Sequence, residues 1–294
     1  MLRWRLPLGA ALIAVFLGLG WLDHTAGLPG AWLMPIALII TLLAAGEMIG
    51  LMKAAGFSPV AWTVYVGSLL VVLASWAPTL LWRAEGQMPH GWLAAWPALA
   101  VAAGAFLVFI AEMRRFDQPG RAIGNLATAV LAIVYVGLMM SFVVRLRLEW
   151  GIGSLASLII VVKMGDTGAY TVGRLIGRHK LAPRLSPGKT VEGALGAALF
   201  SVLGAWFSFQ WLLPWMSTSQ ANKNLGWGWI VFGLLVGMAG LLGDLAESLL
   251  KRDASQKDSS TWMPGFGGVL DLLDSILLAA PVAYVCWTYG LVGQ

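Results

Sequence analysis

The sequence predicts an all-α integral membrane protein built as one polytopic domain. Composition is the first of three observations behind this prediction. Of the 294 residues, 59% are hydrophobic and 11% are charged, whereas ordinary soluble domains carry about 25% charged residues. A soluble globular domain of this composition could not cover itself with polar surface, and intrinsic disorder requires low hydrophobicity. The single cysteine, Cys286, excludes a disulfide framework.

The second observation is the length of the apolar stretches, because a helix that crosses a bilayer needs about 20 mostly apolar residues. The first stretch follows Arg3 and Arg5 and exceeds the core of a signal peptide, which has about 7–15 residues. It is therefore expected to remain as an uncleaved span. The nine predicted spans are 6–22, 30–50, 60–82, 91–111, 122–144, 151–172, 193–213, 225–243 and 266–289.

The third observation is the distribution of basic residues between the two sides of the membrane. If the N-terminus is cytoplasmic and nine spans alternate, 14 lysines and arginines fall in cytoplasmic segments. Four fall in outer segments: Arg83, Arg145, Arg147 and Lys223. The positive-inside rule expects such a bias. We therefore predict that the loops 112–121, 173–192 and 244–265 face the cytoplasm, and that the protein resides in the inner (cytoplasmic) membrane.

The two halves of the chain differ in their charge. Spans two to five are nearly free of charged residues, with Glu47 near the end of the second as the exception. The later part carries the basic loop 173–192, the charged loop 244–265 and a last helix that contains two aspartates. Within a single domain, 1–294, we expect residues 1–150 to be an N-terminal helical part and 151–294 the catalytic part.

Asp271 and Asp274 are the most informative residues of the ninth span. A carboxylate at the centre of a membrane helix costs about 2.5–3.5 kcal/mol. Two at positions i and i+3 share one helical face. They could lie at the interface or pair with basic residues. The functional interpretation is a cation site, since Mg²⁺ prefers carboxylate oxygens together with water and substrate phosphates.

The segment before the ninth span strengthens this interpretation. Asp244, Ser248, Lys251 and Arg252 fall on one face if the segment is helical. A polar stripe beside a membrane indicates a solvated groove. Gly265, Gly267 and Gly268 would let a ligand approach the backbone, and the N-terminus of a helix favours phosphate.

The basic loop offers a third group of polar residues, including Arg174, Lys180 and Lys189. They could bind anionic lipid headgroups or set the topology, or they could contact a phosphate substrate. The tripeptide Gly188-Lys189-Thr190 is not a P-loop, because Pro183 stands where a glycine is required and no strand is expected before it. Lys163 and Asp166, at i and i+3, could neutralise each other or line the same cavity as Asp271.

These segments resemble the signature of the phosphatidate cytidylyltransferases, also called CDP-diacylglycerol synthases. The main motif is Ser248-x2-Lys251-Arg252-x4-Lys257-Asp258-Ser259-x4-Pro264-Gly265-x-Gly267-Gly268-x2-Asp271-x2-Asp274-Ser275. Its companions are Asp166-x3-Tyr170-x2-Gly173-Arg174 and Ser186-Pro187-x-Lys189-Thr190-x-Glu192-Gly193. Three positions depart from the family pattern: Phe266 replaces a histidine, Leu272 an arginine, and Gly188 a residue that is often lysine.

The resemblance implies a reaction in which a phosphatidate oxygen attacks the α-phosphorus of CTP and pyrophosphate leaves. It implies one or two cations, Mg²⁺ first, on Asp244, Asp271 and Asp274. The catalytic residues would be Asp244, Lys251, Asp258, Asp271 and Asp274. Substrate-binding residues would be Asp166, Arg174, Lys180, Ser186, Lys189, Ser248, Arg252, Lys257, Ser259, Gly267 and Gly268.

Two other functions remain open on the sequence. A CTP-dependent lipid kinase would use similar groups on the γ-phosphate. A cation-coupled transporter would also place carboxylates inside the membrane, although no inverted repeat is visible. The expected partners are CTP, phosphatidate and membrane lipid, with no nucleic acid, and a homodimer is a further expectation.

Overall fold

The computed structural model describes residues 14–15, 17–81, 92–216, 226–263 and 267–292. The long helices are α2 (Leu33–Ala54), α3 (Ala61–Leu81), α4 (Trp92–Arg115), α6 (Met139–Ile176), α7 (Val191–Phe207), α9 (Gly228–Asp253) and α10 (Val269–Thr288). Shorter elements are α5 (Ala122–Ala132), the π-helical turns η1 (Ile133–Leu138) and η2 (Ser208–Leu212), and α8 (Leu213–Met216). Two short strands, β1 (Lys180–Ala182) and β2 (Ser186–Thr190), join α6 to α7. The prediction of an all-α membrane protein is confirmed.

Seven helical segments of the described chain are long and apolar enough to cross a membrane. Most of the predicted first span lies outside the described residues. The fifth and sixth predicted spans fall in one continuous segment, Ala122–Ile176. That segment bends at Gly151, whose φ of 83° is left-handed and therefore suits glycine. The protein is thus a multi-pass membrane protein, and both the number nine and the orientation remain predictions.

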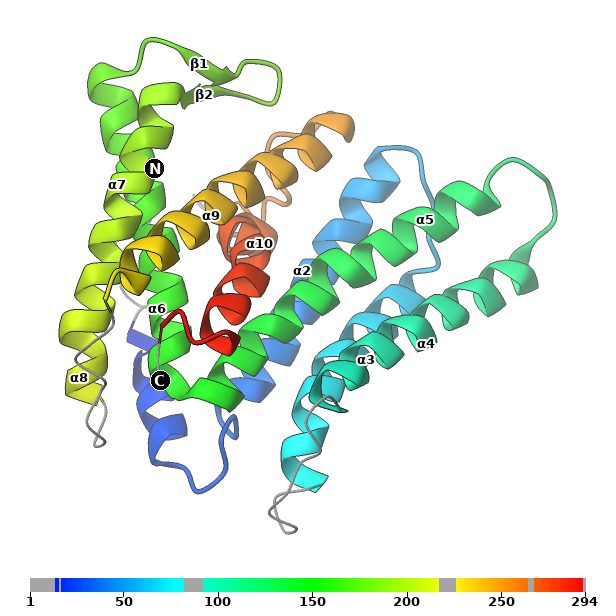
Figure 1. Ribbon diagram of the computed structural model, residues 1–294. Helices are drawn as coiled ribbons and strands as arrows, with labels where there is room; N and C mark the ends of the chain where they lie inside the picture. Colours follow the sequence, from blue (N-terminus) through cyan, green and yellow to red (C-terminus); the bar gives the residue numbers. More distant parts are fainter. Residues whose placement is uncertain (1–13, 16, 82–91, 217–225, 264–266, 293–294) are drawn as a thin grey trace. The chain divides into compact units, whose positions relative to one another are not determined.

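The chain forms two compact units. The first comprises Met1–Leu148 and Leu250–Leu272, and the second comprises Glu149–Leu249 and Leu273–Gln294. The first unit therefore combines α2 to α5 with the end of α9, the loop that follows it and the start of α10. The second contains most of α6, the strands, α7, α8 and the remainder of α9 and α10 (Figure 1).

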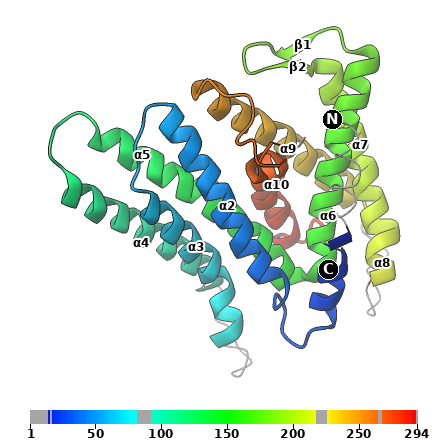
Figure 2. The ribbon, with the colours of Figure 1, turned by 180° about the vertical axis from the view of Figure 1, so that it is seen from behind.

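In the first unit, α3 and α4 lie side by side (Figures 1 and 2). Gly67 and Gly104 permit this approach, because a Cβ at Gly104 would lie 3.3 Å from the Cα of Gly67. A buried ion pair stabilises the start of α2: the Asp23 carboxylate lies 2.7 Å from Arg147 Nη2 and accepts the backbone N–H of Trp32 and Leu33. Arg147, predicted to be an outer cation, is thus buried and paired with a carboxylate.

In the second unit, α6 and α7 run together through small residues. A Cβ at Gly168 would clash with the carbonyl oxygen of Gly196 and lie 2.6 Å from Phe200 Cβ. On the other helix, a Cβ at Gly196 would lie 2.6 Å from Val172 Cβ. Close approach of this kind is how membrane helices gain van der Waals contact without a hydrophobic driving force.

The basic segment contains a β-hairpin as well as loop, which the sequence did not predict. β1 and β2 pair antiparallel, with Lys180 opposite Thr190 and Ala182 opposite Ser186. The strand expected to be absent before Gly188 therefore exists as β1. The motif is still no P-loop, because Lys189 lies within the hairpin strand and Thr190 caps α7 by accepting the backbone N–H of Gly193.

The close contact of α6 with α7 gives a testable prediction. We expect Gly168→Ala to lower the free energy of unfolding by about 1–3 kcal/mol, because the new methyl group forces the two backbones apart. The control is Gly50→Ala in α2, where a Cβ would meet nothing within 4 Å. That variant should stay within about 1 kcal/mol of the wild type or be more stable. Unfolding in mixed micelles measures both, and equal stability of the two variants would contradict the packing argument.

Candidate active site

Asp271, in the first turn of α10, is the centre of a polar cluster in the first unit. Its Oδ1 lies 2.6 Å from Lys251 Nζ, and both side chains are 11% exposed. Its Oδ2 accepts the backbone N–H of Ser259 at 2.9 Å, the Ser259 hydroxyl at 2.6 Å and the Gly268 N–H at 2.9 Å. The Asp271 carboxylate therefore has one cationic partner and three neutral hydrogen-bond donors.

The two glycines before α10 are required by this cluster. Gly267 has a left-handed φ of 84°, and a Cβ there would overlap the Asp271 carboxylate. A Cβ at Gly268 would overlap the carboxylate of Glu47 and the hydroxyl of Ser259. The backbone of Gly267 also pairs with Met263 through two N···O contacts of 3.2 Å. Close approach of the backbone was predicted here, and the groups that approach it in the structure are carboxylates of the protein itself.

Glu47 belongs to this cluster, although the sequence did not identify it as a site residue. Its side chain is buried and accepts hydrogen bonds from the hydroxyls of Ser259 and Ser260 and the indole of Trp262. It also accepts the backbone N–H of Val269 at 2.9 Å and of Leu270 at 2.8 Å. The only sequence signal was a carboxylate in an otherwise apolar span. Its partners are more than 200 residues away, which no local pattern reveals.

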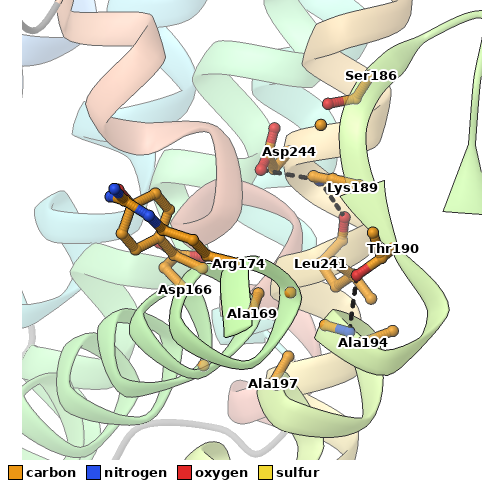
Figure 3. A pocket seen from close by; sticks show the side chains of 16 residues that line it. Asp166, Ala169, Arg174, Ser186, Lys189, Thr190, Ala194, Ala197, Leu241 and Asp244 are labelled. Carbon is orange, nitrogen blue, oxygen red and sulfur yellow. Dashed lines mark hydrogen bonds and ion pairs between the residues drawn. The ribbon is translucent and has the colours of Figure 1, made fainter. Parts of the chain in front are cut away.

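The second unit contains a cavity of about 550 Å³ beside α6, β2, α7 and α9 (Figure 3). Glycines and alanines form much of its wall, and Asp166, Arg174, Ser186, Lys189 and Asp244 supply its polar groups. Lys189 Nζ lies 2.8 Å from Asp244 Oδ2 and donates to the Leu241 carbonyl at 3.4 Å. The cavity therefore has a cation and a carboxylate held together on one wall.

Carboxylates also gather around Asp274 within the second unit. The part of α9 next to Asp244 packs against this position, because a Cβ at Gly243 would overlap the carbonyl oxygen of Asp274. Lys163 Nζ lies 3.0 Å from Asp166 Oδ2. The Ser275 hydroxyl lies 2.9 Å from Asp274 Oδ1 and 3.3 Å from Asp166 Oδ1. The Ser275 hydroxyl therefore lies between two carboxylates of this unit.

The basic residues near the hairpin differ in whether they line the cavity. Arg174 lines the cavity, donates to the Tyr170 hydroxyl at 2.7 Å and lies 5.8 Å from its ring centroid. Lys180 is exposed and is not among the described residues that line the cavity. The ring of His179 lies 2.6 Å from Glu192, which also accepts the Arg178 backbone N–H. This carboxylate ties the base of the hairpin to α7.

The remaining predicted site residues lie at the end of α9 and in the following loop. Ser248 is buried, and its hydroxyl lies 3.4 Å from Asp244. Arg252 is exposed and donates to the Gln256 carbonyl at 3.1 Å. Lys257 and Asp258 are exposed, and Phe266 lies outside the described residues. The structure thus gathers Lys251, Ser259, Gly267, Gly268 and Asp271 in one unit, and Asp166, Arg174, Ser186, Lys189, Asp244, Ser248 and Asp274 in the other.

The carboxylates differ in how well they suit a divalent cation. In the part of the chain that the structure describes, no group of three histidine, cysteine, aspartate or glutamate side chains converges tightly enough to hold a metal. Mg²⁺ needs only one or two carboxylates when phosphate and water complete its shell. Asp271 and Asp244 each have a lysine partner, Lys251 and Lys189 respectively, whereas the Asp274 carboxylate accepts from the Ser275 hydroxyl.

The sequence matches one family of known proteins over nearly its whole length. A model of the Cytidylyltransferase family matches residues 4–289. A phosphatidate cytidylyltransferase of Synechocystis is 36% identical over 200 residues, which cover 57% of this chain and 64% of that protein. Enzymes of the same name from Staphylococcus saprophyticus and Staphylococcus aureus are 36% and 35% identical over 157 and 158 residues, or 53% of this chain and 56% of theirs. The chain thus spans between about half and two thirds of the length of the curated relatives it matches. Since the family match extends over nearly the whole sequence, this membrane protein belongs to the cytidylyltransferase family.

Proposed function

We propose that the protein is a phosphatidate cytidylyltransferase. A phosphate oxygen of phosphatidate attacks the α-phosphorus of CTP, the bond between the α-phosphorus and its bridging oxygen breaks, and pyrophosphate leaves with the electron pair. The products are CDP-diacylglycerol and pyrophosphate. The observation that carries the proposal is the buried Lys251–Asp271 pair, set in the segment that resembles the family signature. The relatives that match the chain carry this name.

The polar groups suit a reaction between two polyanions. Catalysis of phosphoryl and nucleotidyl transfer depends mainly on positioning and on cations that stabilise developing charge. Lys251, held by Asp271, supplies one such cation in the first unit. Lys189 and Arg174 supply two at the cavity of the second unit. We infer that they bind phosphate oxygens, with Ser259 and Ser186 as hydrogen-bond donors.

We further propose that Mg²⁺ supports the reaction, with Asp244 and Asp274 as its protein ligands. Two observations support this assignment: Asp244 lines the cavity, and the carboxylates of Asp274 and Asp166 both lie within hydrogen-bond distance of the Ser275 hydroxyl. A divalent cation would polarise phosphate oxygens and neutralise charge on the leaving pyrophosphate. Asp271 takes a different part in the proposal, as the partner that holds Lys251.

The assay that tests the proposal uses membranes that contain the protein, CTP labelled on the α-phosphate, and phosphatidate. Label is expected to enter chloroform-soluble lipid and to depend on phosphatidate. A CTP-dependent lipid kinase would transfer label only from the γ-phosphate, and a cation-coupled transporter would transfer none. Absence of lipid label from α-labelled CTP, with correctly inserted protein, would exclude the cytidylyltransferase.

The orientation in the membrane gives a further prediction. The bias of basic residues supports a cytoplasmic hairpin and an inner-membrane location. We expect Lys180→Cys, in a Cys286→Ser background, to react with an impermeant thiol reagent only after cells are opened. Lys180 is exposed, so access by the reagent is not limited by burial. Strong labelling of intact cells would show that the hairpin faces the outside, which contradicts the predicted topology.

We also propose that the protein assembles as a homodimer. The mass of the purified protein in detergent would test this.

A further inference from the structure

The loop before α10 has its main anchor on a distant helix of the same unit. The Glu47 carboxylate, on α2, accepts five hydrogen bonds from residues 259–270. Two come from the first backbone N–H groups of α10, which otherwise lack partners within the helix. Three come from the side chains of Ser259, Ser260 and Trp262. One buried carboxylate therefore fixes both the start of α10 and the loop before it.

Ser259 connects Glu47 to Asp271. Its hydroxyl oxygen lies 2.9 Å from Glu47 Oε2 and 2.6 Å from Asp271 Oδ2. A serine hydroxyl has a single proton to donate, so the two carboxylates share or compete for one hydrogen bond. Any change of charge at Glu47 therefore alters the hydrogen bonding of Asp271, the partner of Lys251.

The groups around Glu47 and Ser259 are closely packed. A Cβ at Gly268 would overlap both Glu47 carboxylate oxygens and the Ser259 hydroxyl. Glu47 and Ser259 are each less than a tenth exposed. Because protein interiors are densely packed, loss of an anchor here shifts its neighbours.

We propose that Glu47 is a positioning residue of the active site: through Ser259 and the start of α10, it sets the placement of Asp271 and so of Lys251. This inference rests on the proposed function. Glu47 itself has no contact with the substrate in the proposal. Its effect is expected on the rate of the chemical step more than on the binding of CTP.

Glu47→Gln tests the proposal, because it keeps the size of the side chain but leaves one acceptor oxygen for five donors. We expect kcat per folded molecule to fall by about tenfold or more, while KM for CTP changes by less than about threefold. The matched control is Glu112→Gln, another buried glutamate of the same unit, which pairs with Arg115 in α4. It should leave kcat within about twofold. An unchanged kcat in Glu47→Gln, or an equal fall in the control, would overturn the proposal.

A double-mutant cycle tests the route through Ser259. If Glu47 acts through this hydroxyl, Glu47→Gln should cost much less in a Ser259→Ala background than in the wild type, since neighbours in one network are not additive. Additive effects would overturn the route. Should Glu47→Gln fail to fold, Ser260→Ala removes one of the five donors to Glu47 but keeps the carboxylate itself. It is expected to lower kcat several-fold, and an unchanged kcat would contradict the proposal.

A readout without activity separates this inference from the proposed function. The Trp262 indole donates to Glu47 at 2.8 Å. In protein labelled with 5-fluorotryptophan, its ¹⁹F resonance is identified by its loss in Trp262→Phe. We expect that resonance to shift in Glu47→Gln and to stay unchanged in Glu112→Gln. If the wild type transfers no CMP, the proposed function fails and this resonance decides whether Glu47 holds the loop; an unchanged resonance would show that it does not.

Discussion

Asp271→Asn is expected to lower the rate of CMP transfer by on the order of 10²-fold or more. The carboxylate of Asp271 accepts four hydrogen bonds, one of them from the buried ammonium group of Lys251. An amide has one acceptor oxygen and no charge, so it cannot satisfy these donors. The buried ammonium group of Lys251 would lose its ion pair with Asp271, and breaking a buried pair is strongly unfavourable. Initial rates with purified protein in lipid nanodiscs, normalised to folded protein, measure the effect.

The matched control for this variant is Asp253→Asn. Asp253 is the last residue of α9 and is exposed. Both substitutions remove one negative charge from the same unit, but only Asp271 holds a buried lysine. The control should retain at least about half of the wild-type rate, because exposed charges contribute little. Equal losses in the two variants would show that net charge near the membrane, rather than the Lys251–Asp271 pair, controls the rate.

The membrane helices could be predicted from the sequence, because each depends on the composition of one continuous stretch. A membrane helix needs about 20 consecutive apolar residues, which a sequence shows directly. Eight of the nine predicted spans correspond to the seven described segments, because the fifth and sixth spans both fall in Ala122–Ile176. Gly151, whose φ and ψ are not helical, separates two helices within that segment, at the start of the sixth predicted span. The hairpin at 180–190 was missed because its strands are three and five residues long and lack an alternating apolar pattern.

The candidate site was predictable where its residues lie close together in the sequence. The spacing of Asp244, Ser248 and Lys251 fits α9, and Asp271 and Asp274 both lie on α10. The sequence could not show which lysine pairs with which aspartate. Asp271 accepts from Lys251, whereas Asp244 accepts from Lys189 in β2, and only three-dimensional packing distinguishes these pairs.

Glu47 illustrates the same limit more strongly. In the sequence it is one carboxylate among apolar residues. A carboxylate in a membrane helix indicates a functional role, but it does not show which role. Its identity as the cap of α10 depends on a contact across more than 200 residues. The glycines of the signature have a similar explanation, because Gly268 is required by the bulk of Glu47 and Ser259.

Lys189→Met is expected to lower kcat/KM by on the order of 10²-fold, mainly through a higher KM for a phosphate-bearing substrate. Lys189 Nζ lies on the wall of the cavity beside Asp244, and its side chain is only 14% exposed. Its removal takes away a cation from a site proposed to bind polyanions. It also leaves Asp244 uncompensated close to Asp274 and Asp166, which adds repulsion to any incoming phosphate.

Two further variants decide whether Lys189 acts on the substrate or only on the fold. Lys189→Arg keeps the positive charge and should recover most of kcat/KM, although its planar head group cannot reproduce the lysine contact fully. Arg184→Met, in the exposed turn between the strands, removes a charge from the same hairpin outside the cavity and should change kcat/KM by less than about twofold. If Lys189→Met instead kept its kcat/KM but unfolded at a lower temperature, the pair with Asp244 would serve only to attach β2 to α9. A loss of kcat/KM at unchanged thermal stability is the result that places Lys189 at the substrate.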